Sequence, residues 1–75
     1  MNNKKQTIKP EKRRALYIEY LKKHNGASTS DFLNYLTVNY SYKTSGNTLC
    51  EDRKYLEQLG HKFDVINNVY HLVYV

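Results

Sequence analysis

The chain has 75 residues, of which 40% are apolar and 25% are charged, a composition typical of one small soluble domain. A domain of this size buries only about 60% of its unfolded surface, which leaves little room for an enclosed active-site cleft. The single cysteine excludes an intrachain disulfide framework, and no Cys/His cluster has the spacing of zinc ligands. Because the chain has neither a long apolar run nor a secretory signal at its N-terminus, we expect a cytoplasmic protein without membrane contact.

The net charge of +5 is unevenly distributed. Residues 1–24 carry eight Lys or Arg against two acids, whereas residues 25–75 carry four against five. We expect residues 1–9 to form a flexible basic arm and residues 10–75 to form a single domain. A basic segment indicates an anionic partner, most often a nucleic acid, although it can also be a solvated tail that only aids solubility.

A first helix is expected from Pro10, which a first helical turn tolerates, to His24, before the helix-ending pair Asn25-Gly26. Its periodicity predicts a core stripe of Arg14, Tyr17, Ile18 and Leu21. Leu16 and Tyr20 lie beside this stripe. They are either covered by the arm or the C-terminal segment, or they form a surface for a partner or a second copy.

A second helix is expected to begin at Ser28, which can form a capping box with Asp31. Its predicted buried face consists of Phe32, Leu33 and Leu36. Residues 37–44 are β-branched and polar, so we expect the helix to fray there into a loop. Tyr40 and Tyr42 would then be exposed on that loop, where tyrosines often mark a contact surface.

A third helix is expected from Ser45 or Asn47 to Gly60. Its predicted buried stripe consists of Leu49, Leu56 and Leu59, with Asp52 and Arg53 beside them. The opposite, polar face would carry Asn47, Cys50, Glu51, Lys54 and Gln58.

The last fifteen residues change from a helical to an alternating pattern, which predicts a two-stranded β-hairpin. Asn67-Asn68 suits a two-residue type I′ turn, because asparagine tolerates a positive φ. That turn predicts that Phe63 pairs with Leu72 and Val65 with Tyr70.

The order of three short helices and a hairpin resembles a winged helix-turn-helix DNA-binding domain of the DeoR type and the related HTH-11 class. The resemblance covers residues 12–74 and is carried by three segments, YIEYLKKHNGASTSDFL, SGNTLCEDRKYLEQLG and GHKFDVINNVYHLV. It implies an α+β fold whose third helix reads DNA and whose hairpin is the wing. Two departures are visible: Cys50 and Glu51 stand where the family has paired arginines, and the segment between Ser28 and Ser45 is longer than usual.

In this interpretation the partner is double-stranded DNA, and the third helix enters the major groove. Asn47 suits either adenine or a plain helix cap. Ser45 suits a phosphate at a helix N-terminus, and the lysines and arginines neutralise phosphates. The candidate contact residues are Arg13, Arg14, Lys43, Ser45, Asn47, Thr48, Glu51, Lys54, Lys62, Asn67 and Asn68. The protein would be a transcriptional regulator or accessory factor of a bacterium, a phage or a mobile element, with a homodimer doubling its contacts.

The alternative is a winged-helix module, such as a phage-type inhibitor, that docks on a larger protein without reading DNA. The acidic Glu51 favours it, and its partner surface would include Leu16, Tyr20, Tyr40 and Tyr42. We expect no enzymatic activity and no cofactor or metal, because His24, His61 and His71 are not spaced as ligands or as a triad, and Cys50 has no positioned base.

Overall fold

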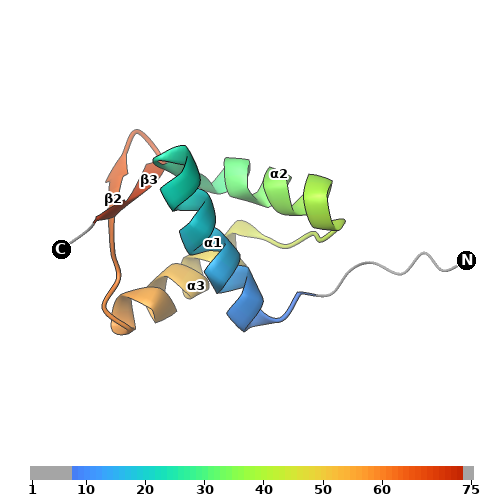
Figure 1. Cartoon of the computed structure of the whole chain (residues 1–75), viewed down its shortest axis with the longest axis horizontal. Coiled ribbons are helices and arrows are strands. Elements are labelled where there is room, and N and C mark those ends of the chain that lie inside the picture. The colour runs from blue at the N-terminus through green and yellow to red at the C-terminus, as the bar shows by residue number, and fades with distance from the viewer. Residues whose placement is uncertain (1–7, 74–75) are drawn as a thin grey trace, which may run out of the picture.

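The computed structural model describes residues 8–73, which form three helices and a three-stranded antiparallel sheet (Figure 1). In chain order the elements are α1 (Pro10–His24), β1 (Ala27–Ser28), α2 (Thr29–Tyr40), α3 (Gly46–Gln58), β2 (Lys62–Ile66) and β3 (Val69–Val73). The expected α+β class is therefore confirmed. Among these described residues, the helices are all too short or too polar to cross a bilayer.

The helix α1 begins and ends where the sequence predicts. Pro10 occupies its first turn, and Asn25 closes it in the left-handed conformation at φ 56°. The buried face includes Tyr17 and Leu21 as predicted, but Arg14 and Ile18 of the predicted stripe are only half-buried. Arg13, rather than Arg14, lies inward with Tyr17 and Leu21, because Arg13 has a buried acidic partner on another helix.

The capping box at the start of α2 is confirmed. The Ser28 hydroxyl accepts from the backbone N–H of Asp31 at 3.1 Å, and the Asp31 carboxylate accepts from the N–H of Ser28 at 3.2 Å. The expected fraying is wrong for residues 37–40, since the helix continues to Tyr40 and ends at Ser41 (φ 52°), whereas residues 41–44 form the expected loop. Within this last turn, the Thr37 hydroxyl donates to the Leu33 carbonyl of the preceding turn at 3.1 Å.

The helix α3 is capped by Ser45, whose hydroxyl accepts from the N–H of Thr48 at 3.3 Å. Its buried side chains are Leu49, Asp52, Arg53 and Leu56. Leu59 was expected among them but is 63% exposed. It is the C-cap residue, beyond the last helical turn, and it borders an open groove.

The hairpin has the predicted register, with Phe63 opposite Leu72 and Val65 opposite Tyr70. Asn67 and Asn68 both have positive φ, 51° and 66°, as a type I′ turn requires. The expected two-stranded sheet gains a third strand, because β1 pairs with β3 and gives the order β1-β3-β2. This short strand ties the α1–α2 connection to the hairpin.

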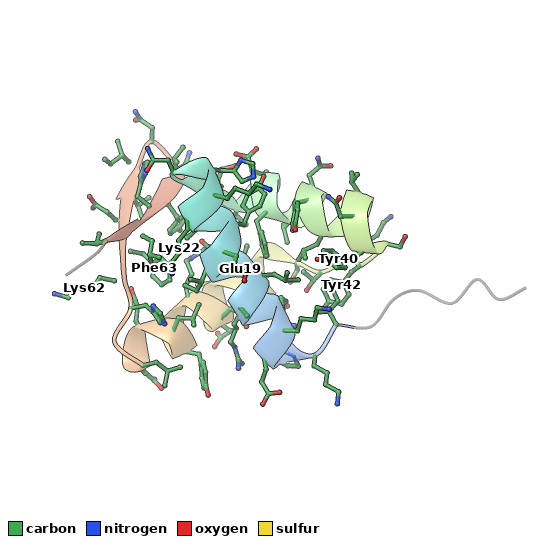
Figure 2. The ribbon with its side chains drawn as sticks, viewed as in Figure 1. Glu19, Lys22, Tyr40, Tyr42, Lys62 and Phe63 are labelled. Carbon is green, nitrogen blue, oxygen red and sulfur yellow. The ribbon has the colours of Figure 1, made fainter. Side chains whose placement is uncertain are left out.

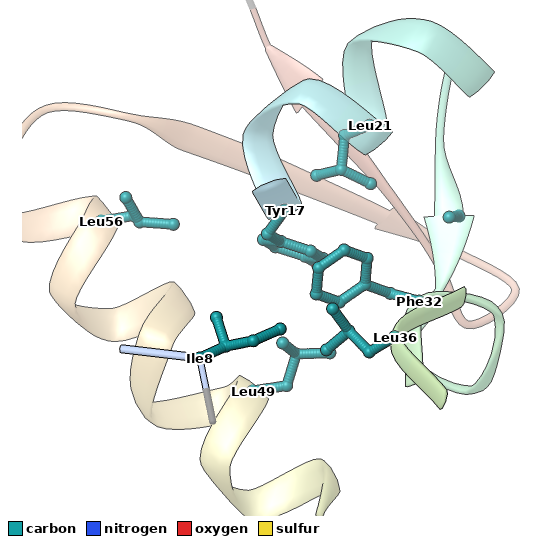
Figure 3. Packing of buried hydrophobic residues seen from close by; sticks show 8 residues of the cluster. Ile8, Tyr17, Leu21, Phe32, Leu36, Leu49 and Leu56 are labelled. Carbon is teal, nitrogen blue, oxygen red and sulfur yellow. The ribbon is translucent and has the colours of Figure 1, made fainter. Parts of the chain in front are cut away.

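The core lies where the three helices meet the sheet (Figure 3). Its largest buried side chains are Tyr17, Phe32, Leu21, Leu36 and Leu49. Ile8, expected within the flexible arm, is only 5% exposed and packs in this cluster, so the domain begins before Pro10. The remainder of the expected arm, residues 1–7, lies outside the described residues.

A continuous series of aromatic rings joins α1 to α2. Tyr17 contacts Phe32 edge-on, with 4.9 Å between ring centroids, and Phe32 contacts Tyr20 at 5.4 Å. Tyr20 continues to Tyr35 at 4.7 Å, and Tyr35 to Tyr40 at 5.9 Å. Contacts of this length favour a fixed relative orientation of the two helices.

Candidate nucleic-acid interface

One side of α3 carries a stripe of exposed polar side chains. Its members recur every three or four residues and are Asn47, Glu51, Lys54 and Gln58. The opposite side of the helix is buried in the core. Ser45 and Thr48, two further candidate contacts, are joined to each other at the start of the helix, with 3.3 Å between their hydroxyl oxygens. We call Asn47, Glu51, Lys54 and Gln58 the polar stripe.

A buried ion pair fixes α3 against α1. The carboxylate of Asp52, 1% exposed, accepts from Nε and Nη2 of Arg13 at 2.5 and 2.7 Å, and from Nε of Arg14 at 3.2 Å. Arg13 also donates to the Tyr42 hydroxyl at 3.2 Å. The hydrogen bond to Asp52 raises the pKa of the Arg13 guanidinium, so this cation stays charged.

Arg13, one of the predicted DNA contacts, is therefore not presented on the surface of this structure. The residue is 7% exposed, and its guanidinium is held by Asp52. Arg14 is half-buried: it shares the same carboxylate, and its guanidinium stacks 3.9 Å from the centre of the Tyr55 ring. The two arginines of the basic face predicted on α1 therefore make contacts within the fold, with Asp52 and Tyr55.

A second buried cation fixes the hairpin. The guanidinium of Arg53 lies 3.7 Å from the centre of the Tyr70 ring in β3, and its Nη1 donates to the Tyr17 hydroxyl at 3.1 Å and to the Thr29 hydroxyl at 3.4 Å. Burial raises the pKa of the Tyr17 phenol, and the nearby Arg53 opposes this shift. Arg53 therefore links α1, α2 and the sheet from a position on α3.

The candidate contacts on the hairpin are all exposed. Lys62 begins β2, and Asn67 and Asn68 form the turn. Asn68 also borders a hollow of about 260 Å³ at the start of α2, which Ser28, Thr29, Ser30 and Tyr70 complete. Sequence reasoning missed this juxtaposition, because only the pairing of β1 with β3 brings the turn beside α2.

Exposed charge is nearly balanced over the described part of the chain. Seven lysines are exposed there (Lys9, Lys12, Lys22, Lys23, Lys43, Lys54 and Lys62), against six exposed acids (Glu11, Glu19, Asp31, Glu51, Glu57 and Asp64). Lys4 and Lys5 of the expected arm lie outside it. Any DNA contact by residues 8–73 consequently depends more on lysines than on arginines.

The side chains of the alternative partner surface are half-buried rather than freely exposed. Leu16, Tyr20, Tyr40 and Tyr42 all pack against the core cluster. Tyr40 ends α2, and Tyr42 points toward α1, where its hydroxyl accepts from Arg13 (Figure 2). The expectation of exposed loop tyrosines is corrected, because both rings complete the packing between α1 and α2.

Within residues 8–73, His, Cys, Asp and Glu side chains form no group of three that could hold a metal ion. Cys50 is half-buried and not disulfide-bonded. Comparison with protein-family models, with curated proteins and with solved structures found no significant match.

Proposed function

We propose that this chain is a winged helix-turn-helix protein that binds double-stranded DNA through α3. The polar stripe is the observation that carries the proposal. A helix that enters the major groove needs polar side chains on its outer face and a rigid attachment behind it. The α3 helix has both, because Asp52 and Arg53 attach it to α1, α2 and the sheet from the side opposite the stripe.

Within the stripe, Asn47 stands in the first turn of α3, where an amide can pair with the N6 and N7 atoms of adenine. Lys54 lies two turns further on and would neutralise a phosphate. Lys43, in the loop before α3, would do the same on the other side of Asn47.

The hairpin supports the same proposal. The three helices and the hairpin follow one another in the order that the winged-helix resemblance implies. Lys62, Asn67 and Asn68 are exposed on it and would contact the DNA backbone beside the groove that α3 occupies. In cells, such a protein would act as a transcriptional regulator or accessory factor.

A salt series with a fluorescently labelled random duplex tests the proposal. We expect the logarithm of the affinity to fall linearly with the logarithm of salt concentration, and Lys54→Ala to reduce that slope by about one. Lys23→Ala, which removes an exposed lysine from the far end of α1, is the matched control and should change the slope less. Equal effects of the two substitutions would show that α3 is not the contact surface.

A protein-binding module is the second candidate. Glu51 stands in the middle of the polar stripe, where it would repel phosphate, and the exposed charge of the described residues is nearly balanced. The substitution Glu51→Gln separates the two proposals. A DNA-binding protein should bind the random duplex more tightly once this charge is removed. If neither the unmodified chain nor Glu51→Gln binds at low salt, the DNA proposal is overturned in favour of a protein partner.

A further inference from the structure

A groove of about 490 Å³ runs between α1 and the C-terminal end of α3. On the α3 side it is bordered by Tyr55 and Leu59, which are 44% and 63% exposed. The α1 side is one stripe of six residues, Glu11, Arg14, Ala15, Ile18, Glu19 and Lys22. Figure 2 shows the last two charged members, Glu19 and Lys22, on neighbouring turns of α1. We call this feature the α1 groove.

The charge pattern of the six α1 residues is complementary to the same pattern on a second, antiparallel α1 helix. In two antiparallel copies of a helix related by a two-fold axis, residue i of one copy lies opposite residue j of the other, and j lies opposite i. With the axis midway between Ala15 and Ile18, Glu11 lies opposite Lys22 and Arg14 lies opposite Glu19. Every charged residue of the stripe then faces the opposite charge, and each of these two pairs occurs twice.

We propose that the α1 groove binds a second copy of this chain, with the two α1 helices packed antiparallel across a two-fold axis. The inference goes beyond the proposed DNA-binding function and does not depend on it, because its charged pairs lie on α1 and not on the polar stripe of α3.

Arg14 can take part although it already contacts Asp52. Two arginines, Arg13 and Arg14, share that single carboxylate, so the buried group retains one positive charge. Arg14 uses Nε for Asp52, and its side chain is 22% exposed at the edge of the groove. Glu19 of the second copy would neutralise the one positive charge of the two arginines that Asp52 does not neutralise.

The centre of the contact would be apolar. Ala15 is exposed and has the smallest side chain of the stripe, so the two helices can approach closely at the axis. Ile18, half-buried, lies opposite it, and Leu59 and Tyr55 would be covered by the helix of the second copy. Burial of these exposed apolar side chains supplies the favourable free energy, while the exposed charged pairs set the antiparallel orientation.

Sedimentation velocity of the full chain over a concentration series, without DNA, tests this inference. We expect the unmodified chain to form dimers as the concentration rises. Glu11→Lys and Lys22→Glu each place like charges opposite each other twice, so each should raise the dimer dissociation constant about tenfold or more. Lys23→Glu makes the same charge change one residue away, outside the groove, and should have a smaller effect.

Recombining the two variants provides the decisive measurement. In a mixture of Glu11→Lys chains and Lys22→Glu chains, both ends of a mixed dimer have opposite charges again, so heterodimers should form. The double variant Glu11→Lys/Lys22→Glu should likewise regain self-association. An unmodified chain that stays monomeric at its highest attainable concentration overturns the proposal. So does a dimer that the single substitutions leave unchanged, or two weakened variants that do not recombine.

Discussion

Asp52 of α3 binds Arg13 of α1 through two parallel hydrogen bonds of 2.5 and 2.7 Å, although the two residues are 39 positions apart in the chain. The bidentate geometry fixes both the distance between the helices and the rotation of α3 about its axis. Because the polar stripe lies on the other side of α3, this pair determines the direction in which Asn47 and Lys54 point.

Removal of the Asp52 charge should strongly destabilise the fold. Asp52→Asn leaves the buried Arg13 without its anion, and we expect the free energy of unfolding to fall by about 3–5 kcal/mol. Urea unfolding followed by circular dichroism measures the change. Glu51→Gln, an exposed neighbour with the same loss of charge, should change stability by less than about 0.5 kcal/mol. Similar losses in both variants would contradict a structural role for the Asp52–Arg13 pair.

Arg53 should not be replaceable by lysine. Arg53→Lys keeps the positive charge but loses the planar group that stacks on Tyr70 while donating to Tyr17 and Thr29. We expect a loss of about 1–3 kcal/mol in the free energy of unfolding. The reciprocal exchange Lys54→Arg at the exposed neighbouring position is the control, with an expected change within about 0.5 kcal/mol. Equal stability of the two variants would show that the stacking contributes little.

Alkaline pH should destabilise the protein through Tyr17. Burial raises the pKa of this phenol in the folded chain, whereas the unfolded chain loses the proton at about pH 10. The contribution is fully present below pH 10, and it is lost as the pH rises toward the higher pKa of the folded state. Chemical unfolding at several pH values should therefore give a steeper decline above pH 10 for the unmodified chain than for Tyr17→Phe. Parallel curves would contradict the assignment.

Replacing each of the three glycines with alanine should lower stability by different amounts, set by backbone strain and by contacts of the added Cβ. Gly26 has φ +112°, and a Cβ there would lie 2.5 Å from Nδ1 of His71, whereas Gly60 has φ +106° with no atom within 4 Å of such a Cβ. Gly60→Ala should cost about 1 kcal/mol from backbone strain, and Gly26→Ala more, because the His71 ring must also move. Gly46→Ala should be nearly neutral, since its Cβ meets only ordinary contact with Thr29 at 3.6 Å. Thermal unfolding of the three variants would establish or refute this order.

The sequence allowed the local structure to be predicted because its determinants are local. Ser28 and Asp31 form their capping box within one helical turn, and Asn67-Asn68 determine the hairpin register through their own backbone conformation. The ends of α1 likewise depend on Pro10 and Asn25, which act on the adjacent turn.

The rest of the fold depends on contacts between distant segments, which periodicity does not reveal. Arg13 is buried only because Asp52 lies opposite it, and an arginine beside an apolar stripe looks equally suited to solvent. The strand β1 has two residues and obtains its partners from β3, so no alternating pattern marks it. Leu59 continues the helical repeat of Leu56, but it lies past the end of α3, where the open α1 groove leaves it exposed.

The aromatic series from Tyr17 to Tyr40 allows the packing of α1 against α2 to be followed by near-ultraviolet circular dichroism. The chain contains no tryptophan, so its near-ultraviolet circular dichroism comes mainly from tyrosine rings held in asymmetric surroundings. Tyr17 and Tyr20 of α1 contact Phe32 and Tyr35 of α2 at centroid distances of 4.7 to 5.4 Å. A state that kept its helices but lost the contact between α1 and α2 would retain its far-ultraviolet spectrum while much of the near-ultraviolet signal disappeared.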